Sequence, residues 1–353
     1  VQSPLEGLAL KLPAPLGKTA AASLPLSVRI ANVSTGSSLR DQIQLELGNV
    51  ASANLVRDVS GPQARVLRGS LALGVPASQA PTLPDSGITA NVVLERLSVD
   101  DWQSLLPAHT ASETDKPAVE KSGNGSALWQ TYLPTRFGLQ ANTLTADGRT
   151  LHQVVAGGVR EGLTWRVNVD ARELSGHLVY GQPTVEPLSL GHLYARLSRL
   201  NLPPSTAADI EGLLETPPVN LPALDIVVES FELRGKKLGR IEIEALNTDL
   251  TSPRSNTSRE WRLSKLNVTL PEASFKASGK WMTSRDSTQP AMTDMNFRLD
   301  VSDAGELLNR LGTKDALRGG GGKLEGQVSL QGSPLTLHYP SLSGRFNVNI
   351  GRG

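Results

Sequence analysis

The residue types that most often carry catalysis are sparse in this sequence. Its five histidines are His109, His152, His177, His192 and His338. None stands at metal-ligand spacing from another histidine or from a pair of carboxylates, and there is no H-E-x-x-H motif or G-x-S-x-G nucleophile elbow. The absence of cysteine excludes disulfides, thiolate metal sites and thiol nucleophiles. We therefore expect no enzymatic active site, no metal and no cofactor.

One glycine-rich stretch resembles a phosphate-binding loop, because four glycines at 319–322 precede Lys323. Such a loop needs a serine or threonine after the lysine for magnesium, and a helix whose N-terminus faces the phosphate. Leu324 stands at that position instead, and a strand pattern follows. A turn between strands explains the glycines better. Paired acids lie at predicted strand ends and helix starts, where capping explains them: Asp100 with Asp101, and Asp300 with Asp303.

Net charge and composition argue against further classes of protein. Lys+Arg number 35 and Asp+Glu 34, so the formal charge of +1 gives no basic footprint for nucleic acid. No stretch approaches the roughly 18 consecutive apolar residues of a membrane span, and no signal peptide opens the chain. Hydrophobic residues make up 39% and aromatic residues only 4%, so any apolar surface is built mostly from aliphatic side chains.

Alternating apolar and polar residues organise the C-terminal stretch 295–350. The period of two that begins at Met295 predicts a strand with one apolar face. Ser302 and Asp303 can then cap a short helix that ends at Gly312. The alternation resumes after the glycine run, so this stretch predicts a strand, a short helix and a meander of amphipathic strands.

A similar order of residues occurs near the middle of the N-terminal half. RLSVDDWQSLLP at 96–107 matches RLDVSDAGELLNRLG at 298–312, since both read Arg-Leu-x-Val, an acidic cap and a short apolar helix. This similarity predicts an internal repeat. The first and last residues both read as strand material, which suggests an internal segment of a longer protein.

The fold class predicted from these patterns is mainly β. Well over a dozen short strands alternate in hydrophobicity, as antiparallel sheets with one wet face do. Two arrangements would account for the apolar face. Two sheets can close on each other, and the pattern alone favours a pair of ordinary β-sandwich domains. Alternatively, an open curved sheet exposes the face as a binding surface, and about 0.8 kcal/mol per buried methylene would hold acyl chains on it.

Strand parity selects the side chains that would line such a groove. A β-bulge would move several of them to the other face. The candidates are Ile226, Val228, Ile241, Ile243, Leu266, Val268, Phe275, Phe297, Leu299, Val328, Phe346 and Val348.

Several phrases of the sequence resemble one protein family. Five stretches resemble the YhdP-type branch of the AsmA-like proteins of Gram-negative bacteria. Three lie in the C-terminal run, namely FRLDVSDAGELLNRL, LRGGGGKLEGQVSLQGSPL and YPSLSGRFNVNI, and two lie earlier, namely LEGLALKLPAPLGKTAAASLPLSV and WRLSKLNVTLPEASFKASGKW. The resemblance covers most of the chain apart from residues 108–127. It implies a long periplasmic protein, anchored in the inner membrane by an N-terminal helix that this chain lacks.

The resemblance also implies a fold and a task. Family members resemble bridge-like lipid-transfer proteins, in which repeated β-groove units form a long open, curved antiparallel sheet with an apolar interior and a few short helices. Their inferred task is to carry phospholipid between inner and outer membranes, so phospholipids and the two membranes are the expected partners. The alternative is a structural β-sandwich protein that scaffolds outer-membrane assembly without binding lipid.

On this basis we expect five regions. They are a β-groove repeat ending in a short helix (1–107), a flexible loop (108–127), strands continuing the sheet (128–202), a proline-rich linker with a short helix (203–222), and a second β-groove repeat with a short helix at 303–312 (223–353).

Overall fold

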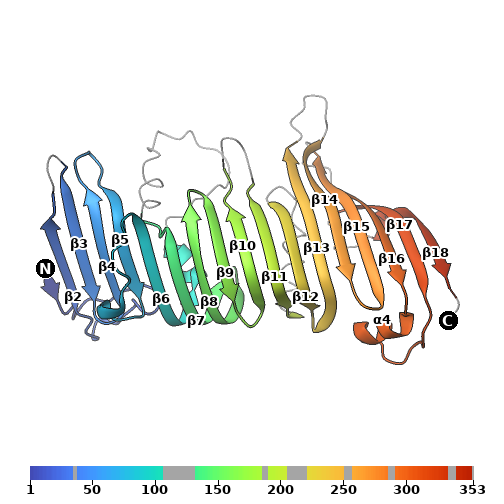
Figure 1. The fold of residues 1–353 in the computed structure, drawn as a ribbon, viewed down its shortest axis with the longest axis horizontal. Coiled ribbons are helices and arrows are strands. Elements are labelled where there is room, and N and C mark those ends of the chain that lie inside the picture. The colour runs from blue at the N-terminus through green and yellow to red at the C-terminus, as the bar shows by residue number, and fades with distance from the viewer. Residues whose placement is uncertain are drawn as a thin grey trace. The chain divides into compact units, whose positions relative to one another are not determined.

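A computed structural model describes residues 1–34, 38–105, 132–184, 190–204, 221–249, 257–284, 291–332 and 339–351 (Figure 1). The predicted fold class is confirmed, because the chain is mainly β and its strands belong to one open 18-stranded sheet. The chain divides into two compact units, Val1–Gly162 with Val167–Arg172, and Leu163–Arg166 with Glu173–Gly353. Strand β9 (Thr164–Asp170) contributes residues to both units, and each unit is described separately.

Within the described residues, the first unit contains eight strands and the helix α1 (Val99–Leu105). The strands are β1 (Gln2–Ser3), β2 (Leu26–Asn32), β3 (Arg40–Leu47), β4 (Ala51–Asp58), β5 (Arg65–Leu73), β6 (Gly87–Ser98), β7 (Arg136–Ala146) and β8 (Arg149–Glu161). A 3₁₀ turn (Ala77–Gln79) precedes β6, and α1 follows it. Neighbours from β1 to β5 pair antiparallel, as do β7 and β8, whereas β6 pairs parallel with both β5 and β7.

The second unit contains nine further strands. They are β10 (Leu174–Gly181), β11 (His192–Leu202), β12 (Ala223–Leu233), β13 (Lys236–Asp249), β14 (Thr257–Thr269), β15 (Ala273–Ser284), β16 (Met292–Val301), β17 (Gly322–Gln331) and β18 (Ser343–Ile350). Helix α4 (Ala304–Leu311) lies between β16 and β17, and a 3₁₀ turn (Tyr339–Ser341) precedes β18. Consecutive strands pair antiparallel except β11 and β12, which are parallel.

The sheet is therefore mixed, whereas the alternation predicted antiparallel pairing throughout. Alternation indicates only that one face of a strand is exposed to solvent. It therefore cannot distinguish a parallel from an antiparallel neighbouring strand when the sheet has one solvent-exposed face. A parallel pair needs a connection that returns to the start of the first strand. Between β5 and β6 this connection is 74–86, and it crosses the polar face, where Ser70 Oγ donates to the Pro81 carbonyl at 2.6 Å. The apolar face of β3–β5 is not covered by this connection.

Helix α4 forms where its caps predict it. The Asp303 side chain accepts a hydrogen bond from the Glu306 amide at 3.0 Å, and Gly312 ends the helix at φ 101°. The glycine run after it is a turn, as expected, because Gly319 and Gly320 have φ values of 62° and 84° that favour glycine. Their carbonyls accept hydrogen bonds from the first α4 amides at 3.1 and 2.6 Å.

The predicted repeat is seen as a strand followed by a helix, since α1 follows β6 and α4 follows β16. The strand after each helix differs, because β7 lies parallel to β6 whereas β17 lies antiparallel to β16. The loop predicted at 108–127 and most of the linker at 203–222 lie outside the described residues. The five-region division remains a prediction.

An ion pair joins β3 and β4 at the end of the apolar face of the first unit, because Asp41 shares its strand parity with Ile43 and Leu45. Arg57 donates from Nε and Nη2 to the two carboxylate oxygens of Asp41 at 3.0 and 2.6 Å, and both side chains are largely shielded. The hydrogen bond from Arg57 holds the pKa of Asp41 below its ordinary value of 3.8. A lowered folded-state pKa stabilises the fold above the unfolded-state value, and this contribution disappears as the pH falls through the folded-state value.

We expect the Asp41–Arg57 pair to make the first unit acid-sensitive. Asp41→Asn should lose about 1 kcal/mol of unfolding free energy at pH 7. Its unfolding free energy should fall less than that of the wild type when the pH is lowered from 5 to 2, because it has no carboxylate to protonate at this position. Urea unfolding at several pH values measures both effects, and Arg57→Gln should flatten the curve similarly. An unchanged pH dependence in both variants would contradict the assignment.

Candidate functional site: the apolar face of β12–β18

The strand register brings all twelve predicted lining residues onto one face of the second unit. Residues opposite one another on neighbouring strands share a face, so a register traces rows across the sheet. A first row contains Val228, Ile241, Val268, Phe275, Leu299, Leu324 and Val348. A second row contains Ile226, Ile243, Leu266, Ala277, Phe297, Gly326 and Phe346. A third row contains Leu224, Ala245, Leu263, Gly279, Met295, Val328 and Gly344.

A β-bulge in β14 preserves this face. Lys265 lies opposite Glu244, but the next residue of β13, Ala245, lies opposite Leu263. The extra residue, Ser264, changes the parity of the strand, so residues 261 and 263 stay on the apolar side together with 266 and 268. Strict alternation along β14, with no bulge, would place Leu263 on the polar face.

Burial changes along the rows. Val228, Ile241 and Val328 are buried, with exposed fractions of 0%, 8% and 6%, whereas Phe346 and Val348 on β18 are 56% and 60% exposed. The other seven predicted residues are half-buried. The face is thus closed by packing near β12 and β13 and accessible near β18.

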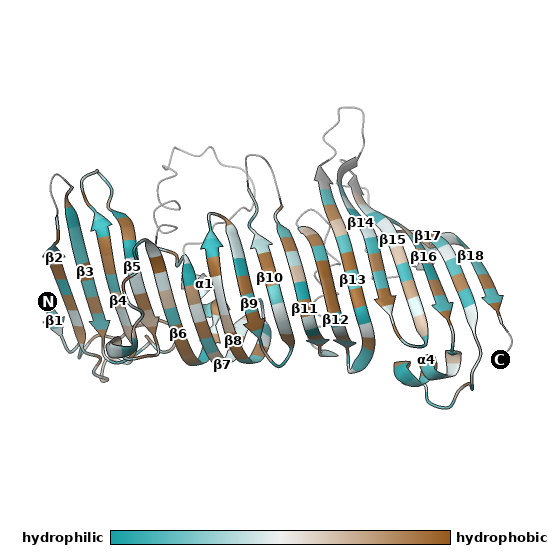
Figure 2. Ribbon diagram, viewed as in Figure 1, coloured by the Kyte–Doolittle hydropathy of each residue, from teal (hydrophilic) through white to brown (hydrophobic). Residues whose placement is uncertain are grey.

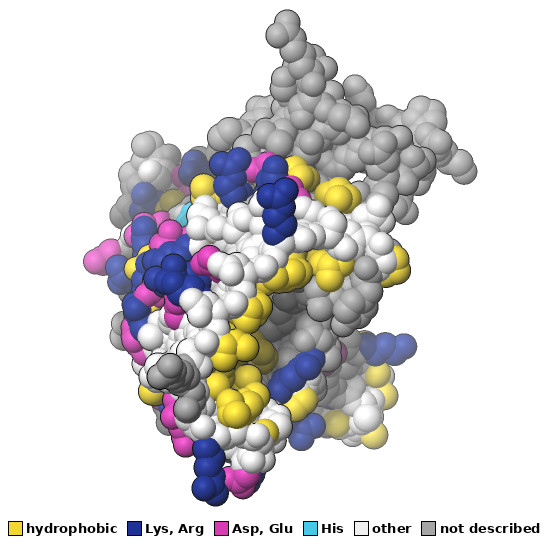
Figure 3. All heavy atoms as spheres, turned by 90° about the vertical axis from the view of Figure 1, so that its right-hand side faces the viewer, with side chains coloured by type: hydrophobic (Ala, Val, Ile, Leu, Met, Phe, Trp, Pro, Cys, Tyr) yellow, Lys and Arg dark blue, Asp and Glu magenta, His cyan; other side chains and the backbone are white. Residues whose placement is uncertain are grey.

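The packed part of the face is a cluster around β11–β13. Its buried members are Ala195, Leu197, Val228, Phe231 and Ile241. Figure 2 shows hydrophobic residues alternating with hydrophilic ones along these strands. In Figure 3, seen from the β18 end, hydrophobic side chains line one wall of a hollow, and many charged side chains lie on the outer surface behind that wall.

Aromatic rings break the aliphatic surface at one place. The chain has five phenylalanines, and three of them meet across β15, β16 and β18. The Phe275 and Phe297 ring centroids are 6.4 Å apart, and those of Phe297 and Phe346 are 6.1 Å apart. The last two rings meet over Gly326, where a Cβ would lie 2.9 Å from Phe297 and 3.0 Å from Phe346. A larger residue at 326 would separate them.

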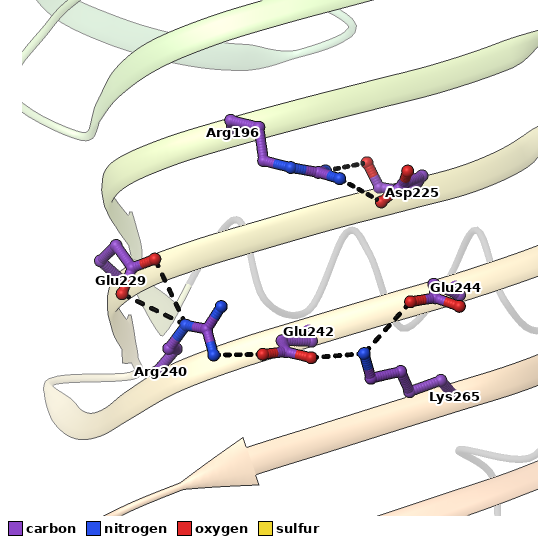
Figure 4. A network of polar contacts seen from close by, with 7 residues as sticks. All are labelled: Arg196, Asp225, Glu229, Arg240, Glu242, Glu244 and Lys265. Atoms are coloured by element: carbon purple, nitrogen blue, oxygen red, sulfur yellow. Dashed lines mark hydrogen bonds and ion pairs between the residues drawn. The ribbon is translucent and has the colours of Figure 1, made fainter.

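The opposite face carries a ladder of charges across β12–β14 (Figure 4). Arg240 contacts Glu229 and Glu242, and Lys265 contacts Glu242 at 2.6 Å and Glu244 at 3.2 Å. The hydrogen bond from Lys265 lowers the pKa of Glu242, so the carboxylate stays charged. These contacts link neighbouring strands on the solvent-exposed polar face.

Further along this polar face, a shallow hollow of about 600 Å³ lies over β14–β18. Its walls are mostly long polar side chains, including Lys276, Arg298 and Arg345. Phe297 and Phe346, two of the predicted residues, also border it.

No catalytic or metal constellation appears in the part of the chain that the structure describes. That part holds no group of three His, Asp or Glu side chains placed to share a metal ion. His152, His177 and His192 lie on β8, β10 and β11, and His109 and His338 lie outside the described residues.

Two parts of the apolar surface lie outside the set predicted from strand parity. In the second unit the first two rows continue onto β10 and β11 through Leu178, Ala195 and Leu197. The first unit has its own apolar rows. One contains Leu26, Leu47, Ala51, Leu73, Val92, Leu139 and Ala156, and another contains Val28, Leu45, Ala53, Leu71, Ala90, Phe137 and Gly158. The alternation of Leu26, Val28 and Ile30 was the signal that could have identified them.

Comparison with curated proteins and with solved structures gives no match. None of the helices in the described ranges is both long enough and apolar enough to span a membrane. The family described as YhdP protein matches residues 1–353, the whole length of the chain. The fold is an open β-sheet whose second unit carries one continuous apolar face. Because the family matches the whole chain, this chain belongs to the YhdP family.

Proposed function

We propose that the apolar face of β12–β18 shields phospholipid acyl chains during transfer between the inner and outer membranes. The observation that carries the proposal is the register, which aligns apolar side chains in rows across seven strands despite the bulge at Ser264. Membership of the YhdP family supports a lipid-transfer type of function without catalysis.

The energetics of the face suit a hydrocarbon ligand. Each methylene removed from water contributes about 0.8 kcal/mol, so a chain of about fifteen methylenes would gain roughly 12 kcal/mol if fully covered. Partial cover on an open sheet gives less, which allows a bound chain to move along the rows. Aliphatic side chains hold such a ligand without fixing its position, as transfer requires.

The place of action in this proposal is the periplasm. The YhdP family is a family of the Gram-negative envelope, which fits this setting. In this proposal the protein is anchored to the inner membrane and delivers lipid to the outer membrane.

A scaffold built from β-sandwiches was the alternative expected from the sequence. In a sandwich a second sheet would cover the apolar rows. All the strands in the described ranges belong to one sheet, and Phe346 and Val348 are more than half exposed. The lipid-shielding function therefore has the better support.

We expect the purified chain to carry phospholipid and an aspartate in the rows to expel it. Ile243→Asp, or Val268→Asp in the adjacent row, should reduce bound phospholipid by at least about tenfold, because a carboxylate on this face lacks a cationic partner. Native mass spectrometry after detergent-free purification measures the lipid bound per chain.

The matched control is Lys276→Asp, which places the same side chain on the polar face beside Asn267 and Arg298. It should retain wild-type lipid loading. Circular dichroism confirms that each variant is folded. Absence of phospholipid from the wild type, or equal loading of all variants, would overturn the proposal.

A further inference from the structure

Two tryptophans extend the apolar face toward one end of its strands. Trp261 on β14 lies opposite Trp281 on β15, and the same row continues through Thr293 and Leu330. All four residues are buried, with exposed fractions of 8%, 2%, 2% and 0%. This tryptophan row lies next to the third row of the face, which contains Met295 and Val328.

The polar groups of this row differ in their hydrogen bonding. Trp261 Nε1 donates to the Pro222 carbonyl at 3.3 Å, and Thr293 Oγ1 donates to the Gly332 carbonyl at 2.7 Å. Trp281 Nε1 is buried and has no hydrogen-bond acceptor within the described ranges. Buried donors are almost always paired, because an unpaired donor loses its hydrogen bond to water without replacement. Trp281 thus offers an unused donor on the apolar face.

A small cavity of about 20 Å³ lies beside the indole. Its walls are formed by Trp261, Leu263, Gly279, Lys280, Trp281, Thr293, Asp294 and Met295. One water-sized sphere needs about 10–15 Å³ on this measure, so the cavity has room for a single oxygen atom and not for a phosphate group.

Resting on the proposed lipid-binding function, we propose that Trp281 Nε1 donates a hydrogen bond to an ester carbonyl oxygen of the bound phospholipid. The acceptor must be neutral, because a charged oxygen in an apolar site without a cationic partner costs far more than one hydrogen bond returns. Lys280 and Asp294 also border the cavity, but the Lys280 Nζ lies 3.7 Å from the Asp294 carboxylate, so the lysine charge is already paired.

An ester carbonyl meets these requirements. It is uncharged, it accepts a hydrogen bond, and it adjoins the acyl methylenes directly. With its oxygen at Trp281, the attached chain would extend over Met295 and then over Phe297 in the second row. The ligand class is therefore an acyl ester lipid, with its glycerol region at the tryptophan end of the strands.

The test compares two lipids that differ only in their two acyl ester carbonyls. The chain is loaded from an equimolar mixture of dipalmitoyl phosphatidylethanolamine and its dihexadecyl ether analogue, and native mass spectrometry gives the ratio bound. The wild type should prefer the ester lipid by roughly threefold to tenfold, the worth of one net hydrogen bond. Equal binding of both lipids by the wild type would overturn the inference and leave the proposed function intact.

The matched variants are Trp281→Phe and Trp261→Phe. Trp281→Phe should bind both lipids equally with similar total loading, whereas Trp261→Phe should keep the preference, because its indole already donates to Pro222. Retention of the ester preference by Trp281→Phe would refute the assignment. If Trp281→Phe does not fold, the wild-type ratio still decides the question. Binding of neither lipid by the wild type would contradict the proposed function itself.

Discussion

Replacing Val228 by aspartate should unfold the second unit. Val228 has no exposed surface and packs among Ala195, Leu197, Phe231 and Ile241, so a carboxylate there would find no water and no cation. Burial of an unpaired charge costs at least several kcal/mol, against a typical domain stability of about 5–15 kcal/mol. Urea unfolding followed by tryptophan fluorescence and circular dichroism should show loss of the cooperative transition or a large fall in its midpoint.

The control for this prediction is one residue away. Val227→Asp places the same carboxylate on the opposite face, where its cross-strand neighbours are Arg196 and Glu242. Because Arg196 is close and water reaches this face, the cost should be below about 1 kcal/mol. Equal destabilisation by the two substitutions would show that the two faces do not differ in environment as described.

Removing the carboxylate of Glu272 should release helix α4 from the sheet. Glu272 lies in the turn between β14 and β15 and is 5% exposed. It accepts hydrogen bonds from Arg310 of α4, from Nε to Oε1 and from Nη2 to Oε2, the second at 3.0 Å. Glu272→Ala would leave the guanidinium against a buried surface without its partner, at a cost of about 3 kcal/mol.

The effect should be local to α4. Hydrogen exchange over residues 304–311 should accelerate at least tenfold, while exchange in β12 and β13 stays protected. Acid should act in the same direction. Arg310 lowers the pKa of Glu272 from its ordinary 4.5, so the pair stabilises the fold above that value and is lost as the pH falls below it.

Glu306→Ala provides the comparison for this experiment. Glu306 is exposed on the same helix, and its removal should change α4 exchange only slightly. Equal acceleration in Glu272→Ala and Glu306→Ala would indicate that the ion pair does not hold the helix.

The sequence by itself determined which side chains share a face within each strand. Parity along a strand is a local property, so Ile241 and Ile243, or Phe297 and Leu299, could be assigned to one side without knowing their neighbours. The caps at Asp303 and Gly312 are local as well, and α4 lies between them. The mainly β class followed from the same local patterns, whereas the family resemblance rested on whole phrases of the sequence.

Tertiary structure decided how those strands join and which part of the face is accessible. Parallel pairing of β11 with β12, and the bulge at Ser264, depend on how each strand is paired with its neighbours, which alternation within one strand does not encode. Val228 and Val348 have the same parity signal. One is fully buried because strands pack on it from both sides, and the other is 60% exposed because β18 pairs only with β17 in the described ranges. The unpaired indole of Trp281 was invisible for the same reason, since a missing acceptor is a property of the folded surroundings and not of the residue.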